Sequence, residues 1–183
     1  FRGKIILSNM YHVGIKDLLK LKVKVGFNNL DFREFMLFDP QTELNLMERM
    51  SAEMRNRLMI NESGDKFEAL LKKTITDALP ICYVEDYLHY SNNVKKNINL
   101  KLLGSAVGWS CSELFKFFAA EAVLKGAKLA EFQHGGNFGS SLSVPEEDMA
   151  VERGIYYSWG HTYKDNNKVT PLPSPYLSKL IDS

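Results

Sequence analysis

Residues 102–133 constrain the fold more than any other segment of this 183-residue chain. The run 102–109 is mostly small and apolar, which is typical of a strand covered on both faces. Ser110 and Glu113 then form a capping box, which predicts the start of a helix. Residues 127–133 are predicted to form the next strand. A strand, a capped helix and a strand within roughly thirty residues indicate a βαβ unit, whose strands are parallel and joined by a right-handed crossover.

A glycine-rich segment follows the second predicted strand. His134 stands where this strand breaks, and Gly135, Gly136 and Gly139 come after it. Glycine lets a backbone approach a ligand closely with its N–H groups turned inward, and an imidazole adds a donor or a proton shuttle. The segment therefore suits an anionic ligand. The alternative interpretation is a tight surface turn with an exposed histidine.

A third parallel strand is predicted over 155–159, with His161 just beyond it. In open parallel sheets, ligands bind beyond the carboxyl ends of the strands. We therefore expect Ser110, His134 and His161 to reach one edge of the sheet, where hydroxyls, helix N–H groups and imidazoles converge. The expected fold class is α/β, with a Rossmann-like parallel sheet.

The first part of the chain shows strand patterns and then helical ones. Residues 4–7 form an apolar run typical of a short strand, and apolar residues alternate strictly with lysine over 19–25, which favours a half-exposed strand. We interpret this lysine row as a solvated edge that resists aggregation; the alternative is a phosphate- or membrane-binding stripe. Helical periodicity then predicts helices over about 43–58, 67–78 and 85–97.

Three smaller features complete the pattern. Ser143 and Glu146 form a second capping box, which predicts another helix start. The prolines of 171–175 predict an extended connector or loop. His12 and His89 are interpreted as ordinary surface residues.

The composition argues against several classes of protein. A formal net charge of +1 gives no electrostatic case for binding nucleic acid. Cys82 and Cys111 form neither a disulfide framework nor a metal-ligand spacing, so we expect a reducing compartment, the cytoplasm. No apolar run approaches the roughly 18 residues that span a bilayer, and no signal-peptide pattern is present. Because the sequence opens on Phe1, we interpret it as an internal piece of a longer protein and expect part of its site outside this sequence.

Several motifs together resemble a known family. Residues 117–121, 126–128 and 132–139 occur in order, and an acidic stretch and residues 156–160 follow at the right distance. The ordered set resembles transferases of bacterial surface-carbohydrate (lipopolysaccharide and capsule) biosynthesis. It is more distantly similar to glycosyltransferase-B fold enzymes, such as capsule Kdo transferases and CDP-glycerol glycerophosphotransferases. The resemblance is strongest over residues 79–178.

The resemblance implies two Rossmann-like domains that face each other across a cleft, with a nucleotide-activated donor held mainly by the second. Residues 1–78 would end an N-terminal domain and supply linker helices. Residues 79–183 would form the first part of the donor-binding domain, a partial glycosyltransferase-B C-terminal domain. The chain has Gly160 and His161 where the family pattern has Gly-Trp, and it stops before the later donor-binding strands.

The same resemblance assigns roles to individual residues. His134 would lie at the cleft near the donor phosphates as a catalytic residue, and Ser110 and Ser112 would offer hydroxyls and a helix N-terminus to a phosphate. The other predicted substrate-binding residues belong to the strand ends and the glycine-rich segment: Gln133, Gly135, Gly136, Asn137, Gly139, Trp159 and His161. For Trp159 the alternative is packing at the end of a strand.

Glu147 is the second residue predicted to be catalytic. An acceptor hydroxyl needs a general base within hydrogen-bond reach. The alternative is that this carboxylate favours a helix N-terminus and stands on a solvated face. No Asp-x-Asp metal motif is present, so we expect a metal-independent transfer in which helix dipoles, N–H groups and imidazole stabilise the leaving phosphate.

The leading hypothesis is a fragment of a glycosyltransferase-like enzyme. It would transfer a sugar or a related group from a nucleotide-activated donor to a bacterial surface glycan or glycolipid, with no further cofactor and with peripheral membrane association left open. The alternative is a non-catalytic Rossmann-like module that binds a nucleotide or a partner protein. An α/β hydrolase is excluded because the chain has no Gly-x-Ser-x-Gly nucleophile elbow.

Overall fold

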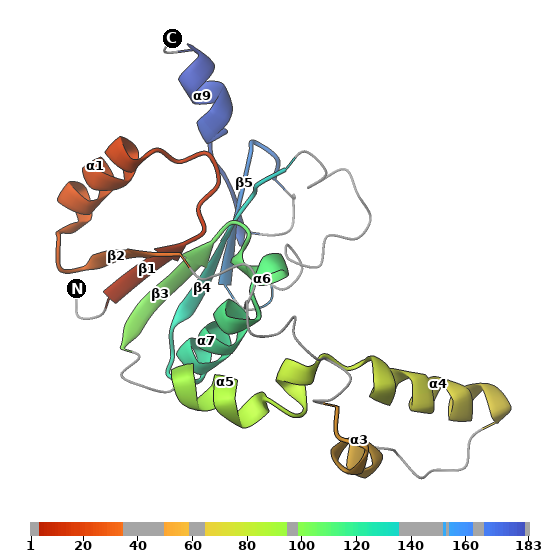
Figure 1. Ribbon diagram of the computed structural model, residues 1–183. Helices are drawn as coiled ribbons and strands as arrows, with labels where there is room; N and C mark the ends of the chain where they lie inside the picture. Colours follow the sequence, from red (N-terminus) through yellow and green to blue (C-terminus); the bar gives the residue numbers. More distant parts are fainter. Residues whose placement is uncertain are drawn as a thin grey trace. The chain divides into compact units, whose positions relative to one another are not determined.

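The computed structural model describes residues 4–34, 50–58, 65–94, 99–135, 152, 154–162 and 167–181 (Figure 1). The chain divides into two compact units. Unit 1 comprises Phe1–Leu37 and Asn97–Ser183, and unit 2 comprises Phe38–Lys96. The described part of unit 2 is helical, whereas unit 1 contains a sheet.

In the described part of unit 1, six strands form one parallel sheet. The strands are β1 (Lys4–Ser8), β2 (Leu30–Arg33), β3 (Leu100–Ser105), β4 (Lys128–Phe132), β5 (Gly154–Ser158) and β6 (Val169–Pro171). Their order is β2-β1-β3-β4-β5-β6, and every neighbouring pair is parallel. This confirms the predicted α/β class with a Rossmann-like parallel sheet, and it places the three predicted strands of the second half side by side.

Two helices connect strands on either side of the β1–β3 pair. Helix α1 (Ile15–Val25) leads from β1 to β2, and α7 (Glu113–Leu124) leads from β3 to β4. The chain therefore winds outward from this pair in both directions, and right-handed crossovers then place the two helices on opposite faces of the sheet (Figure 1). The β1–β3 pair is the topological switch point of a doubly wound sheet.

The N-terminus of α7 differs from the predicted one. The Ser112 hydroxyl accepts a hydrogen bond from the backbone N–H of Phe115 at 3.2 Å, so Ser112 caps the helix. The capping box predicted at Ser110 and Glu113 is therefore wrong. Ser110 belongs to a separate short helix, α6 (Gly108–Cys111), and the extended backbone of Ser112 divides α6 from α7.

Helix α1 occupies the segment where we predicted a strand over 19–25, so that prediction is wrong. Leu18, Lys22 and Val25 are half-buried, with the i, i+4, i+7 spacing of one helix face. The alternating run also places apolar residues on the exposed face of this helix. A two-residue period is therefore compatible with the helix as well as with a strand, and it did not distinguish between them. A helix fits the topology here, because β1 and β2 are parallel, and parallel neighbours need a long crossover between them.

Strand β1 places the beginning of the chain in the centre of the sheet. Its apolar residues Ile5, Ile6 and Leu7 lie between β2 and β3, which suits a run without polar side chains because a central parallel strand is covered on both faces. The sheet therefore extends across the domain boundary that we expected at residue 78.

The prolines near the end of the chain lie in regular structure. Pro171 ends β6 at the edge of the sheet, where its missing N–H removes no ladder bond. Pro175 is the first residue of α9 (Pro175–Ile181), a position where its fixed φ is favourable. The extended connector predicted over 171–175 is thus limited to 172–174. The helix start predicted at Ser143 and Glu146 lies outside the described residues.

The described part of unit 2 contains α3 (Ala52–Leu58), α4 (Lys66–Ala78), the 3-10 turn η1 (Ile81–Tyr83) and α5 (Tyr87–Val94). Helix α4 agrees with the helix predicted over 67–78, and the Asp65 carboxylate caps it by accepting from two backbone N–H groups at 2.9 Å. Helices α3 and α5 fall within the other two predicted helices, whose residues 43–49 and 95–97 lie outside the described ranges. Across the described parts of both units, no helix combines the length and the apolar character needed to cross a bilayer.

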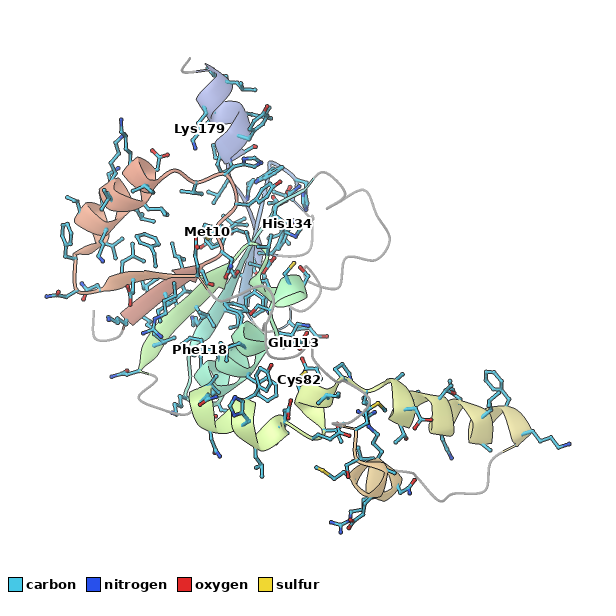
Figure 2. The ribbon with its side chains drawn as sticks, viewed as in Figure 1. Met10, Cys82, Glu113, Phe118, His134 and Lys179 are labelled. Carbon is cyan, nitrogen blue, oxygen red and sulfur yellow. The ribbon has the colours of Figure 1, made fainter. Side chains whose placement is uncertain are left out.

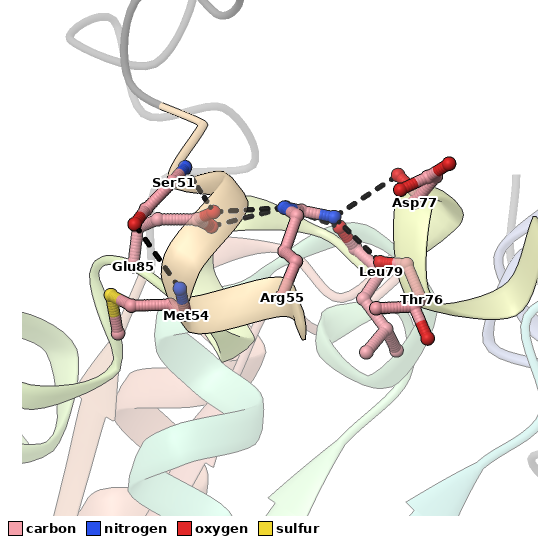
Figure 3. A network of polar contacts seen from close by, with 7 residues as sticks. All are labelled: Ser51, Met54, Arg55, Thr76, Asp77, Leu79 and Glu85. Carbon is pink, nitrogen blue, oxygen red and sulfur yellow. Dashed lines mark hydrogen bonds and ion pairs between the residues drawn. The ribbon is translucent and has the colours of Figure 1, made fainter. Parts of the chain in front are cut away.

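A buried arginine ties the elements of unit 2 together (Figure 3). Arg55 of α3 and Glu85 have side chains that are 4% and 7% exposed, and they form a two-pronged ion pair at 2.8 and 3.0 Å. Arg55 also donates to the carbonyl oxygens of Thr76, Asp77 and Leu79 at 2.8 to 3.0 Å. A helix leaves its last carbonyls without helical partners, so Arg55 closes the end of α4.

Glu85 is fixed from a second side. The backbone N–H of Ser51 donates to Glu85 Oε1 at 2.9 Å. Burial raises the pKa of Glu85, but the hydrogen bonds from Arg55 and Ser51 outweigh this and hold the pKa below its ordinary value of 4.5. Glu85 is therefore held as a carboxylate inside unit 2.

Candidate functional site

The carboxyl edge of the sheet in unit 1 brings together segments that are far apart in the sequence. His134 follows β4, His161 follows β5, and residues 9–14 join β1 to α1. Met10 of that loop and His134 lie at the same end of the sheet (Figure 2). Ser110, on α6 just after β3, also follows a carboxyl end. Because the strands are parallel, their carboxyl ends share one edge, which is where ligands of such sheets bind.

A cleft of about 620 Å³ opens at this edge. Its walls come from the segments after β4, β5 and β6 and from α9: Gln133, Trp159, Gly160, His161, Pro171, Leu172, Pro173, Ser174 and Leu177. The volume is within the range of small-molecule sites, which are mostly apolar with a few polar groups. The indole and the prolines supply apolar surface, and the imidazole supplies a polar group.

A smaller cavity of about 40 Å³ shares part of its wall with the cleft. Ala106, at the end of β3, and Met10 and Tyr11, after β1, line it together. It therefore lies at the switch point of the sheet, where the general rule places ligands. Phe132 and Tyr157 form another wall, with their rings stacked 4.9 Å apart.

Gln133 joins the segments that follow β4 and β5. Its buried side chain donates through Nε2 to the carbonyl oxygen of Gly135 at 2.6 Å, and its Oε1 accepts from the backbone N–H of Trp159. Because one end must donate and the other must accept, the two bonds fix the orientation of the amide. We predicted that Gln133 binds substrate; in the structure it lines the cleft, and its side chain joins the segments of His134 and Trp159.

The turn that carries His161 is fixed by its own strand end. The buried Ser158 hydroxyl donates to the carbonyl oxygen of His161. Gly160, between them, has a φ of 98°, in the left-handed region that favours glycine. The His161 ring lies 5.9 Å from the ring of Tyr156 and lines the cleft. The imidazole is thus held at a defined place in the cleft wall.

The loop after β1 adds two residues that we did not predict to be part of the site. The Tyr11 ring lies 6.2 Å from the His134 ring in an edge-on arrangement, and 4.1 Å from the His12 ring. His12 has a φ of 57°, which few residues other than glycine adopt. Its carbonyl oxygen accepts a hydrogen bond from Lys179 Nζ of α9 at 2.9 Å. His12 is exposed, as expected, but it belongs to a ring cluster that includes His134 and Tyr176.

A signal for these two residues was present in the sequence. Tyr11 and His12 closely follow the short apolar strand at 4–8, as His134 follows β4. The signal could be used only if that strand was known to lie beside β3. That pairing joins residues from opposite halves of the chain.

A buried polar row crosses the sheet near its carboxyl edge. Ser8, Ser105, Glu131 and Tyr156 occupy paired positions on β1, β3, β4 and β5, and all four are fully buried. Ser105 Oγ accepts from the backbone N–H of Gly108 at 2.9 Å. A glutamate is almost never fully buried unless its charge is met, so Glu131 is an unusual residue for the interior of the sheet, and we did not predict its burial.

The other predicted residues have different positions. Ser110 is exposed, and its hydroxyl donates to the carbonyl oxygen of Val107 at 3.4 Å. Ser112 is buried, and its hydroxyl caps α7 inside the chain. Gly135 accepts from Gln133. The remaining predicted residues lie outside the described ranges: Gly136, Asn137, Gly139 and Glu147.

The polar groups of this edge define what it can do chemically. Imidazoles at His134 and His161 can donate a hydrogen bond to an anionic oxygen or carry a proton. Trp159 and the prolines of the cleft offer a flat apolar surface to a ring. Within the described ranges, no three His, Cys, Asp or Glu side chains are grouped so that they could hold a metal ion.

Comparison with known proteins gives a match at the level of a protein family. The family model described as LIC12162 family transferase matches residues 1–183, which is the whole chain. No curated protein and no solved structure matches the chain.

Proposed function

Because the chain belongs to the LIC12162 family of transferases, we propose that the cleft at the carboxyl edge of unit 1 binds a nucleotide-activated donor. The enzyme transfers the sugar, or a related group, of this donor to a glycan or glycolipid of the bacterial surface. One observation carries the proposal. His134 and His161 follow adjacent parallel strands and reach the same edge as a cleft of about 620 Å³.

The proposed reaction places negative charge on a phosphate. The acceptor hydroxyl attacks the donor carbon and forms a new C–O bond, while the bond from this carbon to the phosphate oxygen breaks and its electron pair stays on the phosphate. We assign the stabilisation of this charge to His134 and to backbone N–H groups of the glycine-rich segment. Glu147 is the proposed general base that takes the proton of the acceptor hydroxyl.

The side chains that contact the remaining parts of the donor are assigned from their chemistry. His161 donates to a phosphate or sugar oxygen, and Trp159 offers a face to a flat ring. The proposed transfer needs no metal, because imidazole and N–H donors meet the charge of the leaving phosphate and the chain has no Asp-x-Asp motif. We place the reaction in the cytoplasm, since neither Cys82 nor Cys111 forms a disulfide.

The test is donor turnover by the full-length protein and its His134→Ala variant. Nucleotide sugars with different bases are offered one at a time, and release of the free nucleotide is measured. We expect one donor to be turned over, and His134→Ala to lower this turnover by about 100-fold or more while the melting temperature stays unchanged.

A matched control separates the enzyme from a binding module. His89→Ala removes an exposed imidazole of unit 2 that pairs with Asn93, and it should leave turnover unchanged. If neither the wild-type protein nor any variant releases nucleotide, and His134→Ala only weakens donor binding, the chain is a binding module. If no donor stabilises the folded protein, the proposal is wrong.

A further inference from the structure

Helix α1 carries an apolar stripe on its solvent side. Ile15, Leu19 and Val23 follow one another at four-residue intervals, and they are 77%, 50% and 64% exposed. Residues four apart lie one above the other on the same side of a helix. Large apolar side chains that stand together in solvent mark a surface that binds something.

A lysine stripe runs beside the apolar one. Lys16, Lys20 and Lys24 have the same four-residue spacing, displaced by one position. Each position turns a helix by about 100°, so the lysines lie next to the apolar stripe and away from the face of Leu18 and Val25, which is half-buried. One face of helix α1 thus packs against the rest of unit 1. The remaining surface of the helix carries adjoining apolar and basic stripes.

The charge of α1 is a local property. Its eleven residues include four lysines and one aspartate, whereas the whole chain has a formal net charge of only +1. Helix α4 is the natural comparison, because it also exposes large apolar side chains such as Phe67 and Leu70. Its three lysines are nearly balanced by Glu68 and Asp77. Apolar exposure is common to both helices, and concentrated positive charge belongs to α1.

We propose that α1 docks unit 1 onto the surface of an anionic lipid bilayer. Ile15, Leu19 and Val23 enter the boundary between headgroups and acyl chains, and the lysines reach the phosphates of anionic lipids while their stems cover apolar surface. Complementary charge selects this partner: an uncharged apolar partner would leave three lysine ammonium groups beside the contact without counter-charges. The docking does not depend on the donor chemistry proposed above.

The test is flotation of the full-length protein with lipid vesicles. Vesicles of pure phosphatidylcholine are compared with vesicles that contain phosphatidylglycerol. We expect binding only to the anionic vesicles, weakened by high salt because exposed charges are screened. The triple variant Lys16→Gln, Lys20→Gln, Lys24→Gln should bind about 100-fold more weakly, since each surface lysine contributes about fivefold.

Two further variants separate charge from apolar contact and from general effects. Leu19→Ser with Val23→Ser should also weaken binding, while circular dichroism and melting temperature stay unchanged because both side chains are exposed. The matched control replaces the α4 lysines Lys66, Lys72 and Lys73 with glutamine; it removes the same charge and should leave binding unchanged.

Other occupants of the stripe would give other results. Dimerisation that is lost in the Leu19→Ser, Val23→Ser variant, without vesicle binding, would assign the stripe to a second copy of the chain. Protection of Lys16, Lys20 and Lys24 from an amine-reactive reagent in the free full-length protein would assign it to another segment of that protein. The proposal would also be overturned if the protein bound neutral and anionic vesicles equally. It would likewise be overturned if the α4 variant lost as much vesicle binding as the α1 lysine variant.

Discussion

Single residues at the carboxyl edge hold the segments of the site through bonds within the chain. Gln133 bridges the segments after β4 and β5, Ser158 fixes the turn of His161, and Lys179 holds the loop of Tyr11. Each of these three residues can stabilise the site without contacting a ligand. Their bonds hold the segments that follow β1, β4 and β5 at the edge where the cleft opens, which is the kind of support a preformed site requires.

Glu85 gives a prediction at this scale, because its pKa lies below the ordinary value of 4.5. The folded protein therefore stabilises the carboxylate, and this stabilisation is fully present above about pH 4.5 and is lost as the pH falls through the lower pKa of the folded state. The unfolding free energies of wild type and Glu85→Gln should differ most at neutral pH, and the difference should shrink below about pH 4.5.

Denaturant titrations at several pH values between about 3 and 7 measure this difference in unfolding free energy. A tenfold difference in proton affinity between the folded and unfolded states corresponds to about 1.4 kcal/mol. Glu53→Gln is the control, since it removes an exposed carboxyl group from the same unit. A constant difference between wild type and Glu85→Gln over the whole range would contradict the assignment.

Secondary-structure elements in unit 2 depend on one arginine. Arg55 joins α3 to the end of α4 and to Glu85 by five short hydrogen bonds. Arg55→Met should cost about 3 to 5 kcal/mol, because it leaves a buried carboxylate and three carbonyls without their donor. Hydrogen exchange over Lys66–Ala78 should become faster, starting at the C-terminal end of the helix.

Arg57→Met is the matched control for this change. Arg57 lies on the same helix and pairs with Glu53 at 2.6 Å, but both side chains are exposed. Exposed pairs of this spacing contribute only about 0.3 to 0.5 kcal/mol. Equal losses of stability from the two variants would show that burial of Arg55 has no special role.

Elements governed by local patterns were predictable. The strands predicted where β3, β4 and β5 lie and the periodicity of α4 agree with the structure, because burial of a strand and a 3.6-residue period leave direct traces in sequence. Helix α1 was predicted as a strand because a run in which apolar residues alternate with lysine is compatible with a half-exposed strand and also with the exposed face of a helix. Strand β6 was missed because prolines at a sheet edge resemble those of a loop.

The site was predictable only in part, for a related reason. The positions of His134 and His161 at the carboxyl edge were predictable because each directly follows a strand that the sequence reveals. Tyr11 and His12 required the pairing of β1 with β3, and the internal bonds of Gln133 required the pairing of β4 with β5. The Arg55–Glu85 pair likewise joins positions thirty residues apart. Contacts between distant segments have no local signature.

At the scale of the whole molecule, the topology explains why the site histidines gather at one edge. Parallel strands that wind outward from the β1–β3 pair send every strand end toward the same side. Three of the four histidines of the chain follow strand ends there, namely His12, His134 and His161. The fourth, His89, lies in unit 2 and serves as an internal control.

Nuclear magnetic resonance of the histidine rings tests the central claim most directly. The imidazole signals of the full-length protein are assigned by single substitutions and followed while nucleotide sugars and nucleoside diphosphates are added. We predict that the signals of His134 and His161 shift together at the same ligand concentration, while that of His89 stays in place. A ligand that is turned over but shifts only His89, or shifts none of the rings at the carboxyl edge, would contradict the account.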